Sequence, residues 1–351
     1  MADVKKSPNA LKVMLILASF VIIIAGMKAA SDILVPFLFS IFLSIITSSL
    51  LYWLNKKKIP MLVSLLIVIL FVLGAVFLLV LLFKSSINDF TQSLPLYQEK
   101  LGSLIGLLAK IIGSYGINFS EKQIMEYIDP GAAMRFVSLI LANLKSLLSN
   151  AFFIILTVIF IMFEAASMPA KMNSALEGSR FTFAHIEVLM KDINHYMVIK
   201  TFMSLATGLL VTLWLSILKV DYPFLWGLLA FIFNFVPNIG SIIAAIPAIL
   251  LALVQAGYGT AALTAGGYIV FNVGISNFIE PRFMGSELGI STLVVFLSLI
   301  FWGWVLGPLG MVLAIPLTMT MKIALSCSEE TAWISILLGA APRKKRGKVK
   351  D

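Results

Sequence analysis

Few polar side chains at membrane depth could carry chemistry, and the candidates lie in the C-terminal third of this sequence. The polar residues in or beside the apolar runs of that region are Asn234, Asn238, Ser241, Gln255, Asn272, Ser276, Asn277, Glu280 and Arg282. Polar groups are costly in lipid and usually face a bundle interior or a cavity. Because amides donate and accept hydrogen bonds, Asn234 and Asn238 predict either the binding of a hydroxyl-rich solute or the capping of free helix ends. Both interpretations stay open.

A second group of these residues forms a run toward Pro281. Asn272, Ser276, Glu280 and Arg282 follow one another at spacings of four, four and two. Asn272 is a candidate for the solute pathway. Glu280 and Arg282 form either an interfacial ion pair or a gating pair whose separation accompanies transport.

The sequence lacks the motifs that hydrolytic and redox enzymes need. It has no Gly-x-x-x-x-Gly-Lys-Ser/Thr loop to cradle a nucleotide phosphate. The two histidines, His185 and His195, lie in a polar stretch, and Cys327 is the single cysteine. These counts argue against an intramembrane Ser–His protease, a metal site and a disulfide framework. We therefore expect no enzyme and no cofactor, and any active transport must draw on an ion gradient or on the gradient of the substrate itself.

The composition is that of an all-α polytopic membrane protein. Hydrophobic residues make up 60% of the 351 positions and charged residues 12%, whereas soluble domains carry about 25% charged residues. The net charge is +9, but the basic residues cluster beside apolar segments, as they do at the cytoplasmic ends of membrane spans. No basic surface with interleaved aromatic residues lies outside the spans, so we expect a lipid bilayer and no nucleic acid as partner.

Apolar length divides the chain into about eight membrane segments. The expected parts are three N-terminal spans (residues 1–83), an extracytoplasmic amphipathic insertion (84–150), a fourth span (151–166), a cytoplasmic amphipathic helix (167–200), a transport core (201–323) and a basic tail (324–351). The basic loop at 55–60 and the basic tail predict that both termini are cytoplasmic. An apolar stripe with spacings of three and four from Ile87 to Ile111 predicts packing onto the membrane domain or, alternatively, a subunit interface.

Two of the eight segments, residues 224–254 and 292–323, are broken in the middle in a similar way. The first break is NFVPNIG at 234–240 and the second is GWVLGPLG at 303–310. Each arm of the first segment is only about 20 Å long as a helix, short of the ~30 Å hydrocarbon core. We therefore favour re-entrant hairpins over crossing helices, with one hairpin opening to each side. Paired breaks of this kind indicate a transporter's substrate site. The expected pathway residues are Asn234, Pro237, Asn238, Gly240, Asn272, Gly307, Pro308 and Gly310.

Several strings in this region resemble those of the autoinducer-2 exporter (AI-2E) family. They are PFLWGLL at 223–229, the break at 234–240, NFIEPR at 277–282, GISTLVV at 289–295 and GPLGM at 307–311. Where the family often has Ile-Pro-Tyr-Ile-Gly, this chain has Asn238 in place of the tyrosine. The resemblance implies a multi-pass transporter of the bacterial inner membrane that forms a homo-oligomer, with a pentamer the expected form.

Three functions follow as hypotheses. The first is a secondary transporter that exports a small polar solute of the autoinducer-2 type by alternating access. The second is a sodium/proton antiporter, for which buried carboxylates are needed. The third is a non-transporting scaffold that assembles through its outer insertion, although a scaffold gains nothing from freed backbone groups in lipid.

Overall fold

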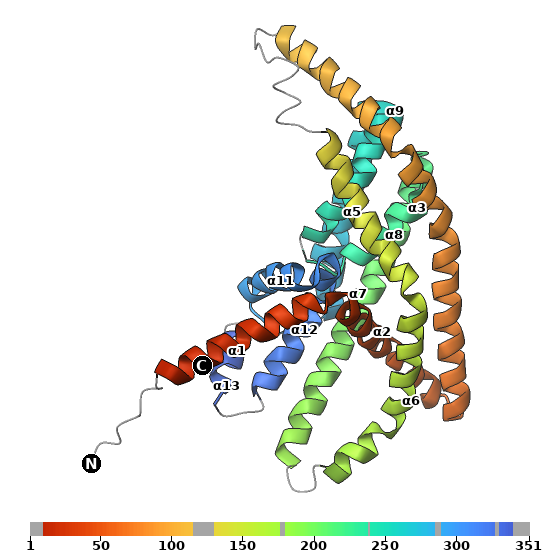
Figure 1. Ribbon diagram of the computed structural model, residues 1–351. Helices are drawn as coiled ribbons and strands as arrows, with labels where there is room; N and C mark the ends of the chain where they lie inside the picture. The colour runs from red at the N-terminus through yellow and green to blue at the C-terminus, as the bar shows by residue number, and fades with distance from the viewer. Residues whose placement is uncertain are drawn as a thin grey trace, which may run out of the picture.

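The computed structural model describes residues 10–114, 130–175, 180–237, 239–284, 289–326 and 330–339, and within these ranges all regular structure is helical. The predicted all-α fold is confirmed. The N-terminal part contains α1 (Ala10–Ala29), α2 (Ser31–Lys56), α3 (Met61–Ser114), α5 (Pro130–Ser149), α6 (Ala151–Ala175) and α7 (Arg180–Ile217), as Figure 1 shows. Asn238, parts of the outer insertion and the basic residues of the tail lie outside the described residues.

Five described helices are long and apolar enough to cross a membrane, and six if a bent pair counts as one span. The bent pair consists of α5 and α6, which meet at 49°. Shorter apolar helices are the Leu17–Ala29 part of α1, α8 (Pro223–Phe233) and α11 (Thr292–Leu306). The protein is therefore a multi-pass membrane protein, and the count of eight segments stays a prediction. The predicted boundary at residue 200 falls inside α7, which runs without interruption from Arg180 to Ile217.

The outer insertion packs onto the rest of the molecule through its apolar stripe. Phe90, Leu94, Tyr97 and Leu101 on α3 are buried in one core with residues of α5 and α8. The Phe90 ring meets the Trp226 ring edge-on, with their centroids 5.3 Å apart. Of the two interpretations of the stripe, the structure supports packing within the chain for this part of α3.

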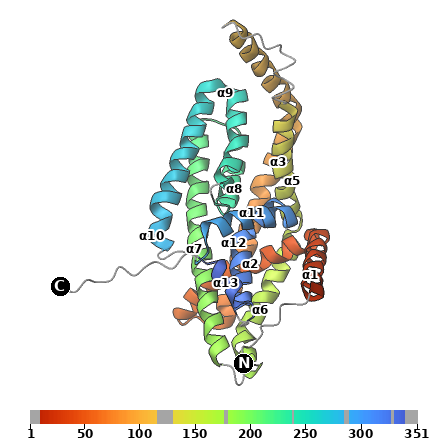
Figure 2. The ribbon, with the colours of Figure 1, turned by 90° about the vertical axis from the view of Figure 1, so that its left-hand side faces the viewer.

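The first broken segment forms a hairpin of α8 and the early part of α9 (Ile239–Val273). Its two ends meet, because the backbone N–H of Asp221 donates to Gln255 Oε1 at 3.1 Å. At Gly257 the backbone leaves helical geometry (φ 82°), and α9 turns back as a second limb. Figure 2 shows the two limbs of α9 side by side below this bend. The second limb continues into a π-helix, η1 (Gly274–Ile279), and α10 (Glu280–Met284). We call α8 and the α9 residues before Gly257 the first hairpin.

The second broken segment is also a hairpin, made of α11 and α12 (Pro308–Ser326) and followed by α13 (Ala332–Leu337). Its break is Gly307, whose positive φ of 75° suits glycine alone. The ends of this hairpin come together where the Lys322 ammonium contacts the Gly289 carbonyl oxygen. We call α11 and α12 the second hairpin. In Figure 2 the bend of α9 lies above α8 and α13 lies below α12, so the hairpins open in opposite directions.

Candidate functional site

The tip of the first hairpin is a tight turn in which the backbone satisfies most of its own hydrogen bonds. The Val236 N–H donates to the Phe233 carbonyl at 2.8 Å, and the Gly240 N–H donates to the Val236 carbonyl at 3.2 Å. Gly240 is buried so closely against the turn that a Cβ atom there would fall on the Phe233 carbonyl oxygen. Gly240 was expected in the solute pathway, but the structure gives it a steric role: it lets α9 start directly beside the end of α8, and it does not line the cavity at this tip.

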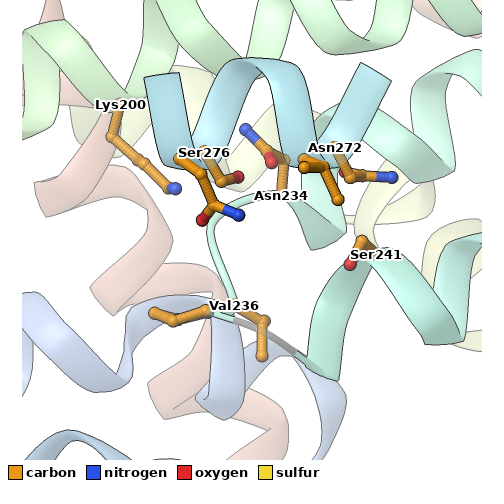
Figure 3. A pocket seen from close by; sticks show the side chains of 9 residues that line it. Lys200, Asn234, Val236, Ser241, Asn272 and Ser276 are labelled. Carbon is orange, nitrogen blue, oxygen red and sulfur yellow. The ribbon is translucent and has the colours of Figure 1, made fainter. Parts of the chain in front are cut away.

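A polar cavity of about 150 Å³ lies at this tip, between the first hairpin, α7 and the end of the second limb of α9 (Figure 3). We call it the polar cavity. Its lining residues are Lys200, Asn234, Val236, Pro237, Ser241, Asn272, Val273, Ser276 and Asn277. Sequence segments up to 77 residues apart therefore converge here. Three of the predicted pathway residues, Asn234, Pro237 and Asn272, are among them.

Amide and hydroxyl groups dominate the chemistry of the polar cavity. Asn234 is buried, and its Nδ2 donates to Ser204 Oγ on α7 at 3.0 Å. Asn272 Nδ2 donates to the Tyr268 carbonyl at 2.8 Å. Ser276 and Asn277 belong to η1, and π-helices are frequent at functional sites because the wider turn displaces side chains.

A buried ion pair borders the polar cavity. Lys200 Nζ lies 2.8 Å and 3.0 Å from the two carboxylate oxygens of Glu280, and both side chains are largely buried. The partner of Glu280 is therefore Lys200 on α7 and not Arg282, which is exposed. The reason is helical geometry, since residues two apart do not face each other on a helix. Lys200 is a site residue that the sequence alone did not indicate, although its place immediately before the apolar run at 201–218 was a signal.

The break of the second hairpin lies beside the end of α8. A small apolar cavity of about 20 Å³ is lined by Leu229, Ile232 and Phe233 of α8 and by Pro308, Leu309 and Val312 of α12, with three residues of α5. A Cβ atom on Gly310 would fall on the Trp302 carbonyl oxygen. Gly307, Pro308 and Gly310 thus shape the second tip, and Pro308 meets the first hairpin there. These residues do not line the polar cavity.

No cluster of three or more His, Cys, Asp or Glu side chains that could hold a metal ion occurs within the described ranges. Charge at the polar cavity comes from Lys200 and is balanced by Glu280. The arrangement therefore presents hydrogen-bonding groups with little net charge, which suits a neutral polar molecule better than a strongly charged one.

Comparison with known proteins gives a consistent result. The model of the family described as "AI-2E family transporter" matches residues 17–329. The chain is 39% identical over 330 residues to "AI-2 transport protein TqsA" of Escherichia coli K12, covering 94% of this chain and 96% of the relative. It is 40% identical over 337 residues to a "Putative transport protein" of Haemophilus influenzae, covering 94% and 97%. It is 34% identical to YhhT of Escherichia coli K12, which carries the same kind of name, over 95% and 96% of the two chains.

Proposed function

This chain belongs to the AI-2E family of transporters, and from that premise we propose that it exports a small, neutral, hydroxyl-rich solute of the autoinducer-2 type. The observation that carries the proposal is the polar cavity at the tip of the first hairpin. Its amide and hydroxyl groups can both donate and accept hydrogen bonds. A volume of about 150 Å³ is small beside typical drug-sized sites of roughly 300–1,000 Å³ and suits a small solute.

Alternating access would arise from the two hairpins. Their tips meet between α8 and α12, and their open ends point in opposite directions. Movement of the hairpins against the frame of α2, α3 and α6 would open the polar cavity first to one side and then to the other. The same proposal places the protein in a bacterial inner membrane as a homo-oligomer, with a pentamer the expected form and both termini in the cytoplasm.

The proposal is tested by deleting the gene and measuring autoinducer-2 inside and outside the cells. Deletion should raise the internal share of the signal, and the wild-type gene should restore export. The Asn272→Ala variant should restore it only partly. Asn150→Ala is the matched control, because Asn150 Nδ2 also donates to the carbonyl four residues earlier but Asn150 does not line the polar cavity. Unchanged partitioning in the deletion strain would refute the proposed substrate class.

A sodium/proton antiporter is the second candidate, and one observation favours it. Glu280 is a buried carboxylate that pairs with Lys200, a residue that lines the polar cavity. A cation that entered the cavity would compete with the ammonium of Lys200 for that carboxylate. Everted vesicles with a pH-sensitive dye would show sodium-dependent proton movement in this case, whereas a flat trace between about pH 7 and 9 would count against it.

A further inference from the structure

Two hydroxyl groups on the second limb of α9 are buried without a hydrogen-bond partner. Thr264 is 0% exposed and Tyr268 is 3% exposed. Within the described part of the chain, neither Thr264 Oγ1 nor the Tyr268 hydroxyl has a donor or acceptor in reach. Buried polar groups are nearly always hydrogen-bonded, because losing the bonds to water without replacement costs folding free energy. Their burial therefore calls for an explanation other than stability.

Other helical threonines in this protein satisfy their hydroxyl groups locally. Thr201, Thr207, Thr212 and Thr320 each donate to the carbonyl oxygen four residues earlier, at 2.7 to 2.9 Å. Thr264 lies within a helix too but does not make this bond. Its hydroxyl is therefore unbonded but closed off from solvent, so another molecule can bond it only after the surrounding helices move apart.

The two hydroxyl groups continue the line of the polar cavity. Thr264, Tyr268 and Asn272 follow one another at intervals of four, so they lie on one face of the limb at steps of about one turn, or roughly 5.4 Å. Asn272 lines the polar cavity, and its Nδ2 donates to the carbonyl of Tyr268. From Asn272, therefore, this face leads through Tyr268 and Thr264 toward the bend at Gly257.

We propose that Tyr268 and Thr264 form a second binding position for the solute, between the polar cavity and the Gly257 end of the molecule. Each hydroxyl donates one hydrogen bond and accepts others, so the position fits the hydroxyl or carbonyl groups of a neutral, oxygen-rich molecule. Neither residue lines the polar cavity and both are buried, so the position opens only when the hairpins move in the transport cycle. A solute that leaves the polar cavity along this face then exchanges its bonds to Asn272 for bonds to Tyr268 and then to Thr264. This inference rests on the proposed function and adds the route of the solute to it.

Release of radiolabelled autoinducer-2 from proteoliposomes, together with thermal unfolding of the purified protein, tests this position. Tyr268→Phe and Thr264→Val each remove a hydroxyl and keep the shape. We expect about three- to tenfold slower release, as for the loss of one hydrogen bond to the solute. The unfolding temperature should stay the same or rise, because the hydroxyl has no partner to lose. Tyr258→Phe is the matched control, since Tyr258 lies on the same limb but is 52% exposed, and it should release at the wild-type rate.

The outcomes separate this inference from the function on which it rests. Slower release with an unchanged or higher unfolding temperature, restored in Thr264→Ser, would support the second binding position. Wild-type release in both variants, or a lower unfolding temperature in both, would overturn this inference alone, because the hydroxyls would then be idle or purely structural. No release by wild-type protein would overturn the proposed function and the second position with it.

Discussion

In both hairpins a glycine just after the break packs against a carbonyl group of the arm before it. Gly240 lies against Phe233 in the first hairpin, and Gly310 lies against Trp302 in the second. Each first arm also contains a tryptophan whose indole N–H is satisfied: Trp226 donates to the Asp221 carbonyl at 2.9 Å, and Trp302 donates to Thr318 Oγ1 at 3.2 Å. The two breaks therefore share the same steric device, while the two indoles use different acceptors, a backbone carbonyl before α8 and a side chain of α12.

The two tips differ in the chemistry that they present. The first tip lines the polar cavity with Asn234 and Ser241, and the Lys200–Glu280 pair lies beside it. The second tip contributes Pro308 and Leu309 to an apolar cavity against α8. A broken membrane helix therefore does not by itself mark a binding site. We infer that the first hairpin holds the solute and that the second supports it and moves against it.

The largest expected effect follows from removing charge at the first tip. Lys200→Met leaves Glu280 buried without its partner and should lower the free energy of unfolding by about 3–5 kcal/mol. Lys171→Met is the matched control, because its pair with Glu164 is more than half exposed on both sides and should matter by less than about 1 kcal/mol. Thermal unfolding in detergent measures both. Equal losses of unfolding free energy in the two variants would mean that burial does not make the Lys200–Glu280 pair more important. The double variant Lys200→Met, Glu280→Leu should recover much of the lost free energy, because no unpaired charge is left buried.

The shared steric device predicts equal damage at both tips. Gly240→Ala and Gly310→Ala each push a methyl group onto a backbone carbonyl, and overpacking of this kind costs about 1–3 kcal/mol or more. Gly259→Ala should be harmless, because a Cβ atom there meets nothing within 4 Å. Size-exclusion profiles and unfolding temperatures would report the damage. If only one of the two variants lost stability, the two glycines would not have the same steric role.

Two buried side-chain hydrogen bonds, one in each hairpin, test whether only the first hairpin binds the solute. Asn234→Ala removes the bond to Ser204 at the first tip, and Thr318→Ala removes the acceptor of the Trp302 indole in the second hairpin. Each should cost about 1–3 kcal/mol, because a buried polar group is left without its partner. Only Asn234→Ala should also slow autoinducer-2 release from proteoliposomes. A similar slowing by Thr318→Ala at equal stability would show that the second hairpin takes part in binding.

The sequence indicated the hairpins because Pro, Gly and Asn residues inside apolar segments free backbone groups, which are costly in lipid unless the chain turns back within the protein. Short arms and cytoplasmic charge then limited the possible topology. Asn234, Pro237 and Asn272 could be chosen for the same reason: they are polar or helix-breaking residues where apolar ones are expected.

The sequence could not show which side chains far apart along the chain would contact each other. Lys200 lies 80 positions from Glu280 and, in the sequence, marks the end of a polar stretch, so the nearby Arg282 was the natural but wrong partner. Thr264 and Tyr268 also escaped notice. A threonine and a tyrosine in a membrane helix usually find a local partner or the interface, and only the packed structure shows that these two do not.

The smallest perturbation tests the geometry of the hairpins through single cysteines, introduced after Cys327→Ser removes the native thiol. Phe224→Cys and Ala256→Cys mark the ends of the first hairpin, and Leu293→Cys and Met321→Cys mark those of the second, all at exposed positions. Because Asp221 contacts Gln255 and Gly289 contacts Lys322, the two ends of each hairpin must lie on one side of the membrane. A membrane-impermeant thiol reagent added to intact cells should therefore label the first pair from outside and should reach the second pair only after the membrane is permeabilised. Labelling of Phe224→Cys and Ala256→Cys from different sides would mean that the first segment crosses the membrane. Labelling of all four positions from outside would mean that the hairpins open in the same direction, and the geometric basis for alternating access would then be lost.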